Sequence, residues 1–224
     1  MYKSKVRTTK EKIVIILSVA AGILYSSWPL GYVLNPKVAR TSLASGLEAP
    51  HQPYNWVFVG ADVTSSLLAI AACVLLWHTY QKAARRKPIL AGLLCTILFA
   101  IGTMMAALLP EHCVPNLMVC PSPLQDRFLL VHGAFSILGS VGLFVALVIW
   151  WFQKRTDALL LTMLVAYIIF GTISLMQAIV PAGRGNWSQD YYMTLCSVLL
   201  MCLPACLAVI APGRKLQVVP NRVR

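Results

Sequence analysis

The sequence predicts an all-α integral membrane protein: six transmembrane helices in an antiparallel bundle, with both termini in the cytoplasm. Three observations support this fold class. Of the 224 residues, 58% are hydrophobic and only 12% are charged, whereas soluble domains carry about 25% charged residues. The apolar residues fall into six long runs. The basic residues gather in alternate connections between these runs, as expected of a chain that crosses a membrane repeatedly.

The six apolar runs are each 21 to 25 residues long and cover 13–34, 56–77, 89–109, 128–152, 158–180 and 191–211. A helix needs about 20 residues to cross a hydrocarbon core of about 30 Å, and it satisfies its backbone hydrogen bonds internally. The first run is longer than the roughly 7–15 apolar residues of a signal peptide, and we interpret it as an uncleaved signal anchor. We therefore expect a transmembrane domain at 13–211 between basic cytoplasmic tails at 1–12 and 212–224.

The net charge of +12 is explained by membrane orientation. Fifteen of the 19 Lys and Arg residues lie before the first run or after the second, fourth and last runs, and four lie in the other connections. Short loops rich in Lys and Arg stay in the cytoplasm and contact anionic headgroups. The distribution predicts a multi-pass protein of the cell membrane. Its expected partners are membrane lipids, with a membrane protein as a further possible partner. It argues against nucleic acid as a partner.

The connections predicted to face outward, 35–55, 110–127 and 181–190, are too short to hold a soluble domain. They and the adjoining span ends carry most of the ionisable residues other than Lys and Arg. On this side we place the acids Glu48, Asp62, Glu111, Asp126 and Asp190 and the histidines His51, His112 and His132. The polar chemistry is therefore expected at the outer membrane face.

Asp62 lies about two turns inside the second run and is followed by Thr64, Ser65 and Ser66. A carboxylate within a span is costly unless it is paired or hydrated, so Asp62 must face protein or water. One interpretation is a site for a ligand, proton or headgroup with Asp62 at its base. The other is a buried polar pair that fixes helix packing. In both, we expect Asp62 near His132, since both enter from the same side at similar depths.

His132 precedes a series of small residues, Gly133, Ser136, Gly139 and Ser140, which we expect to form a face that lets another helix approach closely. The histidine is interpreted either as a packing residue of that face or as a proton relay. The pocket candidates are Asp62, His132, Ser65, Ser136, His51, Glu111, His112 and Asp126.

Cys113 and Cys120 lie in one connection and are predicted to form a disulfide, because thiols outside the cytoplasm are oxidised. Metal binding with His112 and Glu111 is the alternative, but the C-x6-C spacing is not a usual zinc spacing. The sequence predicts no metal site and no cofactor.

The stretches "YSSWPLGYVLNP", "SGLEAPHQPYNWVFVGADV", "LLPEHCVPNLMVC" and "LLVHGAFSILG" resemble a bacterial six-span membrane family of unknown function, number 998. The resemblance covers nearly the whole chain. It implies that Asp62, Cys113, Cys120 and His132 carry the character of the family. Because the family has no established biochemistry, the resemblance supports the fold and localisation and leaves the function open.

Three functions fit these observations. The first is a binding or accessory protein with a polar pocket at the outer leaflet. The second is a small proton-coupled transporter that uses Asp62 and His132. The third is a membrane-embedded lipid-modifying enzyme that adds Ser65 or Ser136 to that pair. No G-x-S-x-G, H-E-x-x-H or phosphate-binding glycine loop is present, so the sequence does not decide whether the protein is an enzyme.

Overall fold

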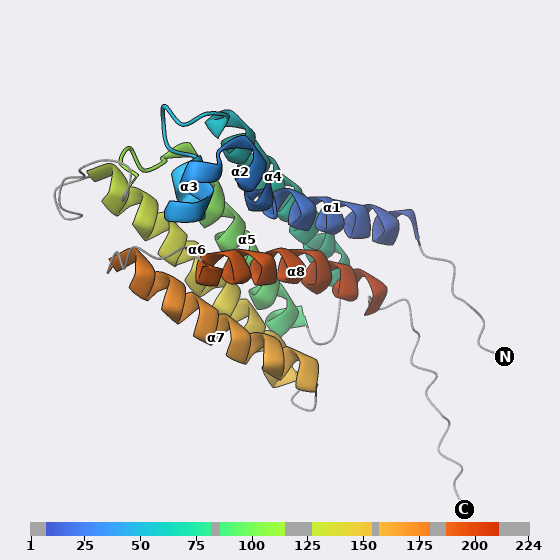
Figure 1. The fold of residues 1–224 in the computed structure, drawn as a ribbon. Coiled ribbons are helices and arrows are strands. Elements are labelled where there is room, and N and C mark those ends of the chain that lie inside the picture. Colours follow the sequence, from blue (N-terminus) through green and yellow to red (C-terminus); the bar gives the residue numbers. More distant parts are fainter. Residues whose placement is uncertain (1–7, 82–85, 115–126, 154–156, 180–186, 211–224) are drawn as a thin grey trace, which may run out of the picture.

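The computed structural model describes residues 8–81, 86–114, 127–153, 157–179 and 187–210. In this part of the chain, six helical segments are long and apolar enough to cross a membrane, which confirms the predicted fold class (Figure 1). The segments are α1 (Thr9–Tyr25) with its continuation to Leu34, α4 (Asn55–Tyr80), α5 (Arg86–Leu108), α6 (Arg127–Gln153), α7 (Ala158–Ile179) and α8 (Trp187–Ile210). The cytoplasmic location of the termini stays a prediction, and most of the two expected tails lies outside the described residues.

The first and last helices of the bundle are neighbours. α1 packs between α4 and α8, and α5 packs between α4 and α6. α7 packs against α8 and, less closely, against α6. Figure 1 shows α8 lying beside both α1 and α7. The helices thus surround a common interior, and the contact between α6 and α7 is the loosest between neighbours in this arrangement.

The first apolar run forms one membrane span but not one continuous helix. α1 begins at Thr9, where Thr8 and Glu11 cap its first turn reciprocally. It ends at Tyr25 and is followed by a 3-10 turn, η1 (Trp28–Leu30), and by the short helix α2 (Gly31–Leu34). Pro29 has no backbone N–H to donate, so it cannot continue the hydrogen-bond ladder of α1.

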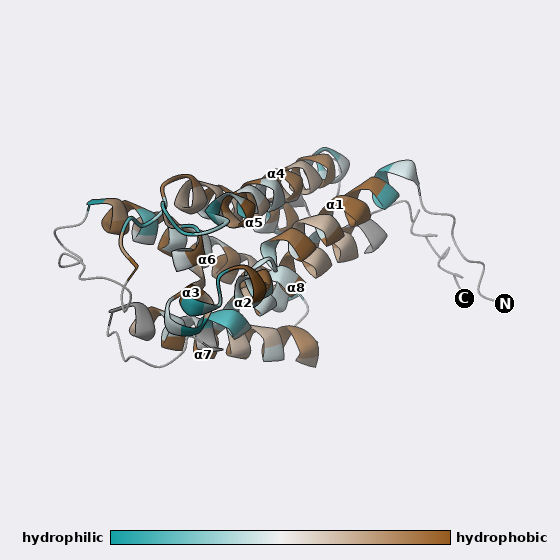
Figure 2. Ribbon diagram, turned by 45° about the horizontal axis from the view of Figure 1, so that its top comes forward, coloured by the Kyte–Doolittle hydropathy of each residue, from teal (hydrophilic) through white to brown (hydrophobic). Residues whose placement is uncertain are grey.

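The connection after α2 folds over one end of the bundle. It contains α3 (Pro36–Thr41) and the 3-10 turn η2 (Ala44–Leu47). We call residues 36–49 the cap, and the end of the bundle that they cover the capped end. The buried cap residues Val38, Leu47 and Ala49 pack with Phe58 of α4 and with Val114. Figure 2 shows hydrophilic segments in and around α3 against the mostly hydrophobic helices.

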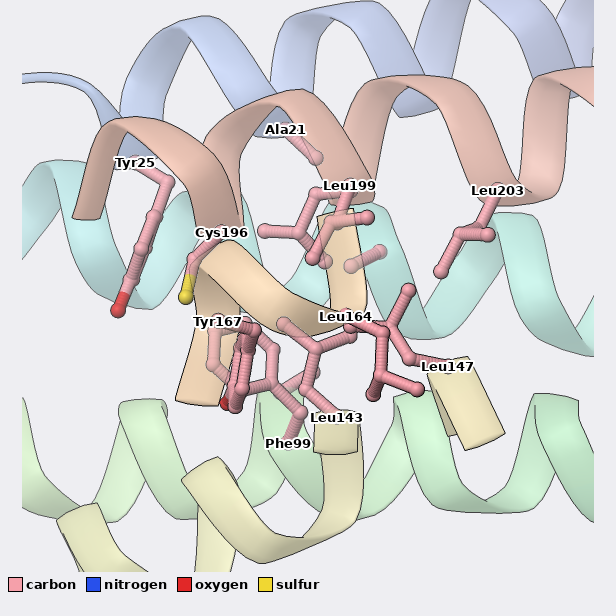
Figure 3. Packing of buried hydrophobic residues seen from close by; sticks show 13 residues of the cluster. Ala21, Tyr25, Phe99, Leu143, Leu147, Leu164, Tyr167, Cys196, Leu199 and Leu203 are labelled. Atoms are coloured by element: carbon pink, nitrogen blue, oxygen red, sulfur yellow. The ribbon is translucent and has the colours of Figure 1, made fainter. Parts of the chain in front are cut away.

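A buried apolar cluster joins α1, α4, α5, α6, α7 and α8 in the middle of the bundle, as Figure 3 shows from close by. Tyr25 of α1 and Phe99 of α5 meet edge to face with their ring centroids 5.5 Å apart. Tyr167 of α7 and Cys196 of α8 point into the same region (Figure 3). The cluster provides the floor of the cavity described below, since Tyr25, Phe99 and Tyr167 also line that cavity.

Glycines allow α5 and α6 to approach closely. A Cβ atom added to Gly102 would lie 2.7 Å from Cα of Gly139, and one added to Gly142 would lie 2.8 Å from the carbonyl oxygen of Cys95. Such contacts are typical of small-residue interfaces in membranes. Gly133, however, has no neighbour within 4 Å of an added Cβ.

The prediction that the small residues of α6 form a single face for helix packing is therefore wrong. Gly139 packs against α5, whereas Gly133, Ser136 and Ser140 line a cavity. The reason is geometric: successive helical residues are about 100° apart. Gly139 therefore points about 100° away from Ser140, while the other three residues share one side of the helix.

Candidate functional site

A cavity of about 480 Å³ lies at the capped end of the bundle. Its walls come from α4, α5, α6, α7 and α8, from the end of α1, and from residues 43–48 of the cap. Ligand pockets in proteins typically enclose about 300–1,000 Å³ and combine apolar walls with a few polar groups. This cavity fits that description, because its lining combines large apolar side chains with three acids and several hydroxyl groups.

Three acidic side chains line the cavity: Glu48 of the cap, Asp62 of α4, and Glu111 after α5. All three are between 3 and 7% exposed. The side chains of Glu48 and Asp62 are hydrogen-bonded to each other. Two ionised carboxylates contain no donor, so one member of this pair carries a proton. Glu111 accepts a hydrogen bond of 2.9 Å from the hydroxyl of Ser45.

Glu48 holds its proton unusually tightly. Burial raises the pKa of Glu48 well above its usual range, and the nearby carboxyl of Asp62 and then that of Glu111 add to the shift. Each cause disfavours the charged form of the side chain. The Glu48–Asp62 pair therefore keeps a proton at pH values at which a solvent-exposed glutamate has lost it.

His132 is buried at the start of α6 and lines the same cavity as Asp62. Its Nδ1 atom lies 2.9 Å from the carbonyl oxygen of Ala106. A carbonyl only accepts, so Nδ1 carries a proton in this contact, and in the neutral imidazole Nε2 is then an acceptor. The structure thus brings Asp62 and His132 into one cavity but gives each its own hydrogen-bond partner, Glu48 for the first and Ala106 for the second.

The other sequence candidates divide into two groups. Glu111 and Ser136 line the cavity. Ser65, in contrast, donates a hydrogen bond of 2.7 Å to the carbonyl oxygen of Ala21 and thereby joins α4 to α1. Ser65 is absent from the cavity lining. Its role is helix packing, and of the two serines suggested for a nucleophile only Ser136 borders the cavity.

The two exposed histidines lie away from the cavity. His51 occupies a turn before α4 with a φ of 72°, and it is exposed. His112 is exposed and stacks on Phe128 with ring centroids 3.8 Å apart. Neither lines the cavity. Asp126 lies outside the described residues.

Sequence reasoning missed several polar groups of the cavity, and Glu48 is the most important of them. A usable signal was present, because the connection that carries Glu48 also contains the apolar residues Val38 and Leu47, which a solvated loop does not need. Further polar groups come from the helices. They include Tyr25, Thr103, Ser140, Tyr167, Gln189 and Tyr192.

Two of these hydroxyls form a connected pair near the floor. The hydroxyl of Tyr167 donates a hydrogen bond of 2.8 Å to the carbonyl oxygen of Ser140. It also lies 2.6 Å from the hydroxyl of Tyr192, which therefore donates in that contact. The floor is thus polar at these hydroxyls, although the rings around it are apolar.

The cysteine prediction falls partly outside the described residues, because Cys120 lies there. The Cys113–Cys120 disulfide therefore stays a prediction. Cys73, Cys95, Cys196, Cys202 and Cys206 are free. Within the part of the chain that the structure describes, no group of three or more His, Cys, Asp or Glu residues is arranged to hold a metal ion.

The fold and the cavity define a class: a multi-pass helical membrane protein with a buried acidic cavity at one end of its bundle. Over residues 18–215, the sequence matches the family described as "Protein of unknown function (DUF998)". The chain belongs to this family, in agreement with the resemblance noted from its motifs. Neither a curated protein nor a solved structure matches the chain.

Proposed function

We propose that the protein is a membrane-embedded binding protein whose cavity, open to the outer leaflet, holds one amphiphilic ligand. The observation that carries this proposal is the cavity of about 480 Å³, whose lining contains three buried acids together with large apolar side chains of α6 and α7. This combination suits a molecule with a polar head and an apolar body.

The free-energy cost of burying three carboxyl groups favours a ligand-binding role for them over a role in helix packing alone. Burying carboxyl groups is unfavourable unless they are fully paired, and acids within membrane spans usually serve a function. The cap also has attachments that do not involve the acids. It packs through Val38 and Leu47 onto α4, and the backbone N–H of Ala44 donates to the side-chain oxygen of Gln189 at 2.6 Å.

The outward orientation of the capped end is part of the proposal. It rests on the 15 basic residues at the opposite side of the predicted topology against four at the capped side. Cysteine labelling from outside intact cells should reach His51→Cys, which lies in an exposed turn beside the cap. Labelling of this variant only after permeabilisation would reverse the orientation.

A direct test is to purify the protein in a mild detergent and to identify retained lipids by native mass spectrometry. We expect the wild type to retain an amphiphile and Asp62→Asn to retain at least about tenfold less, the effect of losing one strong polar contact. Asp190→Asn is the matched control, because Asp190 accepts a hydrogen bond from Tyr32 and does not line the cavity. Equal retention by all three proteins, or none by the wild type, would contradict the proposal.

Proton-coupled transport is a second candidate function. It is favoured by one observation, the hydrogen-bonded pair Glu48 and Asp62, which shares a proton inside the cavity. A transporter of this kind should acidify the lumen of proteoliposomes when substrate moves, and Glu48→Gln should abolish that signal. If the protein only binds its ligand, neither the wild type nor Glu48→Gln should acidify the lumen.

A further inference from the structure

The cap makes entry along the bundle axis unfavourable. Residues 43–48 of the cap line the cavity, and three side-chain contacts attach this segment to different parts of the bundle. They are Ala44 to Gln189 at 2.6 Å, Ser45 to Glu111 at 2.9 Å, and Glu48 to Asp62. A ligand arriving from the capped end would have to break these contacts.

The side of the cavity between α6 and α7 is different. Four of its lining residues are large, apolar and 47 to 51% exposed: Ile137, Val141, Ile168 and Leu175. They belong to α6 and α7, the two neighbouring helices of the bundle that make the loosest contact. α7 is also the least buried span. Of its most apolar 18-residue stretch, 11% is buried, against 28 to 39% in the other spans. These side chains therefore border both the cavity and the surrounding membrane.

The charges of the cavity restrict the head of the ligand. Its described lining contains three acids and no Lys or Arg. Proteins recognise phosphate and carboxylate groups chiefly through Arg, Lys or backbone N–H groups. Carboxyl and hydroxyl oxygens instead accept hydrogen bonds from hydroxyl and amino groups. A negatively charged head would meet like charges here.

We infer that the ligand enters from the membrane between α6 and α7, and that it is a single amphiphile whose head donates hydrogen bonds and carries no negative charge. The inference rests on the proposed binding function and names its substrate class and its route. The head lies against Glu48, Asp62 and Glu111, and the chain extends past Ile137 and Ile168 toward the membrane.

The selectivity for charge can be tested with three probes of equal chain length: monopalmitoylglycerol, hexadecylamine and hexadecyl phosphate. Each is titrated into the purified protein while its thermal unfolding is recorded. We expect the first two to raise the unfolding temperature at concentrations at least about tenfold lower than hexadecyl phosphate requires, a difference set by the acids. Asp62→Asn should reduce the response to hexadecylamine most. Equal responses to all three probes would overturn the selectivity.

The route can be tested by narrowing the gap. Ile137→Trp and Ile168→Trp each place a bulky side chain on the cavity side of α6 or α7. Leu138→Trp and Ile169→Trp are matched controls, because these neighbours are similarly exposed, 43 and 49%, and do not line the cavity. We expect the first pair to slow uptake of monopalmitoylglycerol from vesicles about tenfold and the controls to leave it unchanged.

The lateral route and the binding function can fail separately. Uptake that is unaffected by Ile137→Trp and Ile168→Trp, with binding still sensitive to Asp62→Asn, would overturn the lateral route and leave the binding function standing. A response to none of the probes, together with no retained lipid in the wild type, would overturn the binding function itself.

Discussion

The two sides of α6 carry similar small residues and use them in opposite ways. On one side, Gly139 and Gly142 lie so close to α5 that an added Cβ would meet backbone atoms. On the other side, Gly133 and Ser136 border the cavity, and nothing lies within 4 Å of a Cβ at Gly133. A small residue in a membrane helix thus indicates either a close approach or a space, and the neighbouring helix decides which.

The difference also separates stability from function. The α5–α6 contact is tight and offers no room for a ligand, whereas the α6–α7 contact is loose and borders the cavity. Substitutions on the first side should change folding, and substitutions on the second should change binding.

The largest effect is expected for Gly102→Leu. A Cβ at this position would lie 2.7 Å from backbone atoms of Gly139 and Phe135, and these atoms cannot move aside as a flexible side chain can. Overpacking of this kind typically costs about 1–3 kcal/mol and sometimes more. Unfolding in mixed micelles should show a clear loss of stability. A stable Gly102→Leu variant would mean that α5 and α6 are not packed as described.

A smaller loss is expected for Asp62→Leu. The substitution leaves Glu48 buried without its hydrogen-bond partner, which costs about 1–3 kcal/mol. Asp62→Asn keeps a polar partner for Glu48 and should cost less than Asp62→Leu in the same unfolding assay. If the two variants are equally stable, the Glu48–Asp62 hydrogen bond contributes nothing to the fold.

The stability should also depend on pH through Glu48. Its pKa is raised in the folded protein above the ordinary value of 4.5, chiefly by burial, so the folded state binds this proton more tightly than the unfolded chain does. The contribution is fully present below about pH 4.5 and is lost as the pH rises through the raised pKa. We expect the difference in unfolding temperature between wild type and Glu48→Gln to change over this range. If the unfolding temperatures of wild type and Glu48→Gln change in parallel with pH, Glu48 does not contribute to the pH dependence of stability.

The smallest effect on stability is expected for Gly133→Ala. Apart from its chain neighbours and the adjacent backbone of α6, no atom lies within 4 Å of the added Cβ, and alanine has a better helix propensity than glycine by about 1 kcal/mol. The variant should be as stable as the wild type or slightly more stable. A loss comparable to that of Gly102→Leu would show that the two sides of α6 do not differ as proposed.

The membrane spans could be predicted from sequence because each depends only on a local run of apolar residues. The interruption at Pro29 was also available locally, although hydropathy does not register it. The cavity was only partly predictable. Asp62 and His132 are unusual within spans and therefore attract notice, and both line it.

Glu48 could not be found in this way, because an acid in a connection is ordinary. It becomes important only when Val38, Leu47 and Phe58 pack together and carry the cap onto the bundle. The same holds for Ser65, whose neighbour Ala21 lies 44 positions earlier in the chain. Long-range packing decides both cases. For Glu48 the sequence offers only an indirect sign, the apolar residues Val38 and Leu47 in the same connection.

The contact of α1 with α8 has a consequence for assembly in the cell. Chains are synthesised from the N-terminus, so the first span is complete long before its partner α8 exists. The cap also lacks one of its contacts until then, because the backbone N–H of Ala44 donates a hydrogen bond to Gln189 at the start of α8. The cavity therefore closes only when the last span is inserted, and a chain that stops before α8 leaves α1 and the cap as exposed targets for quality control.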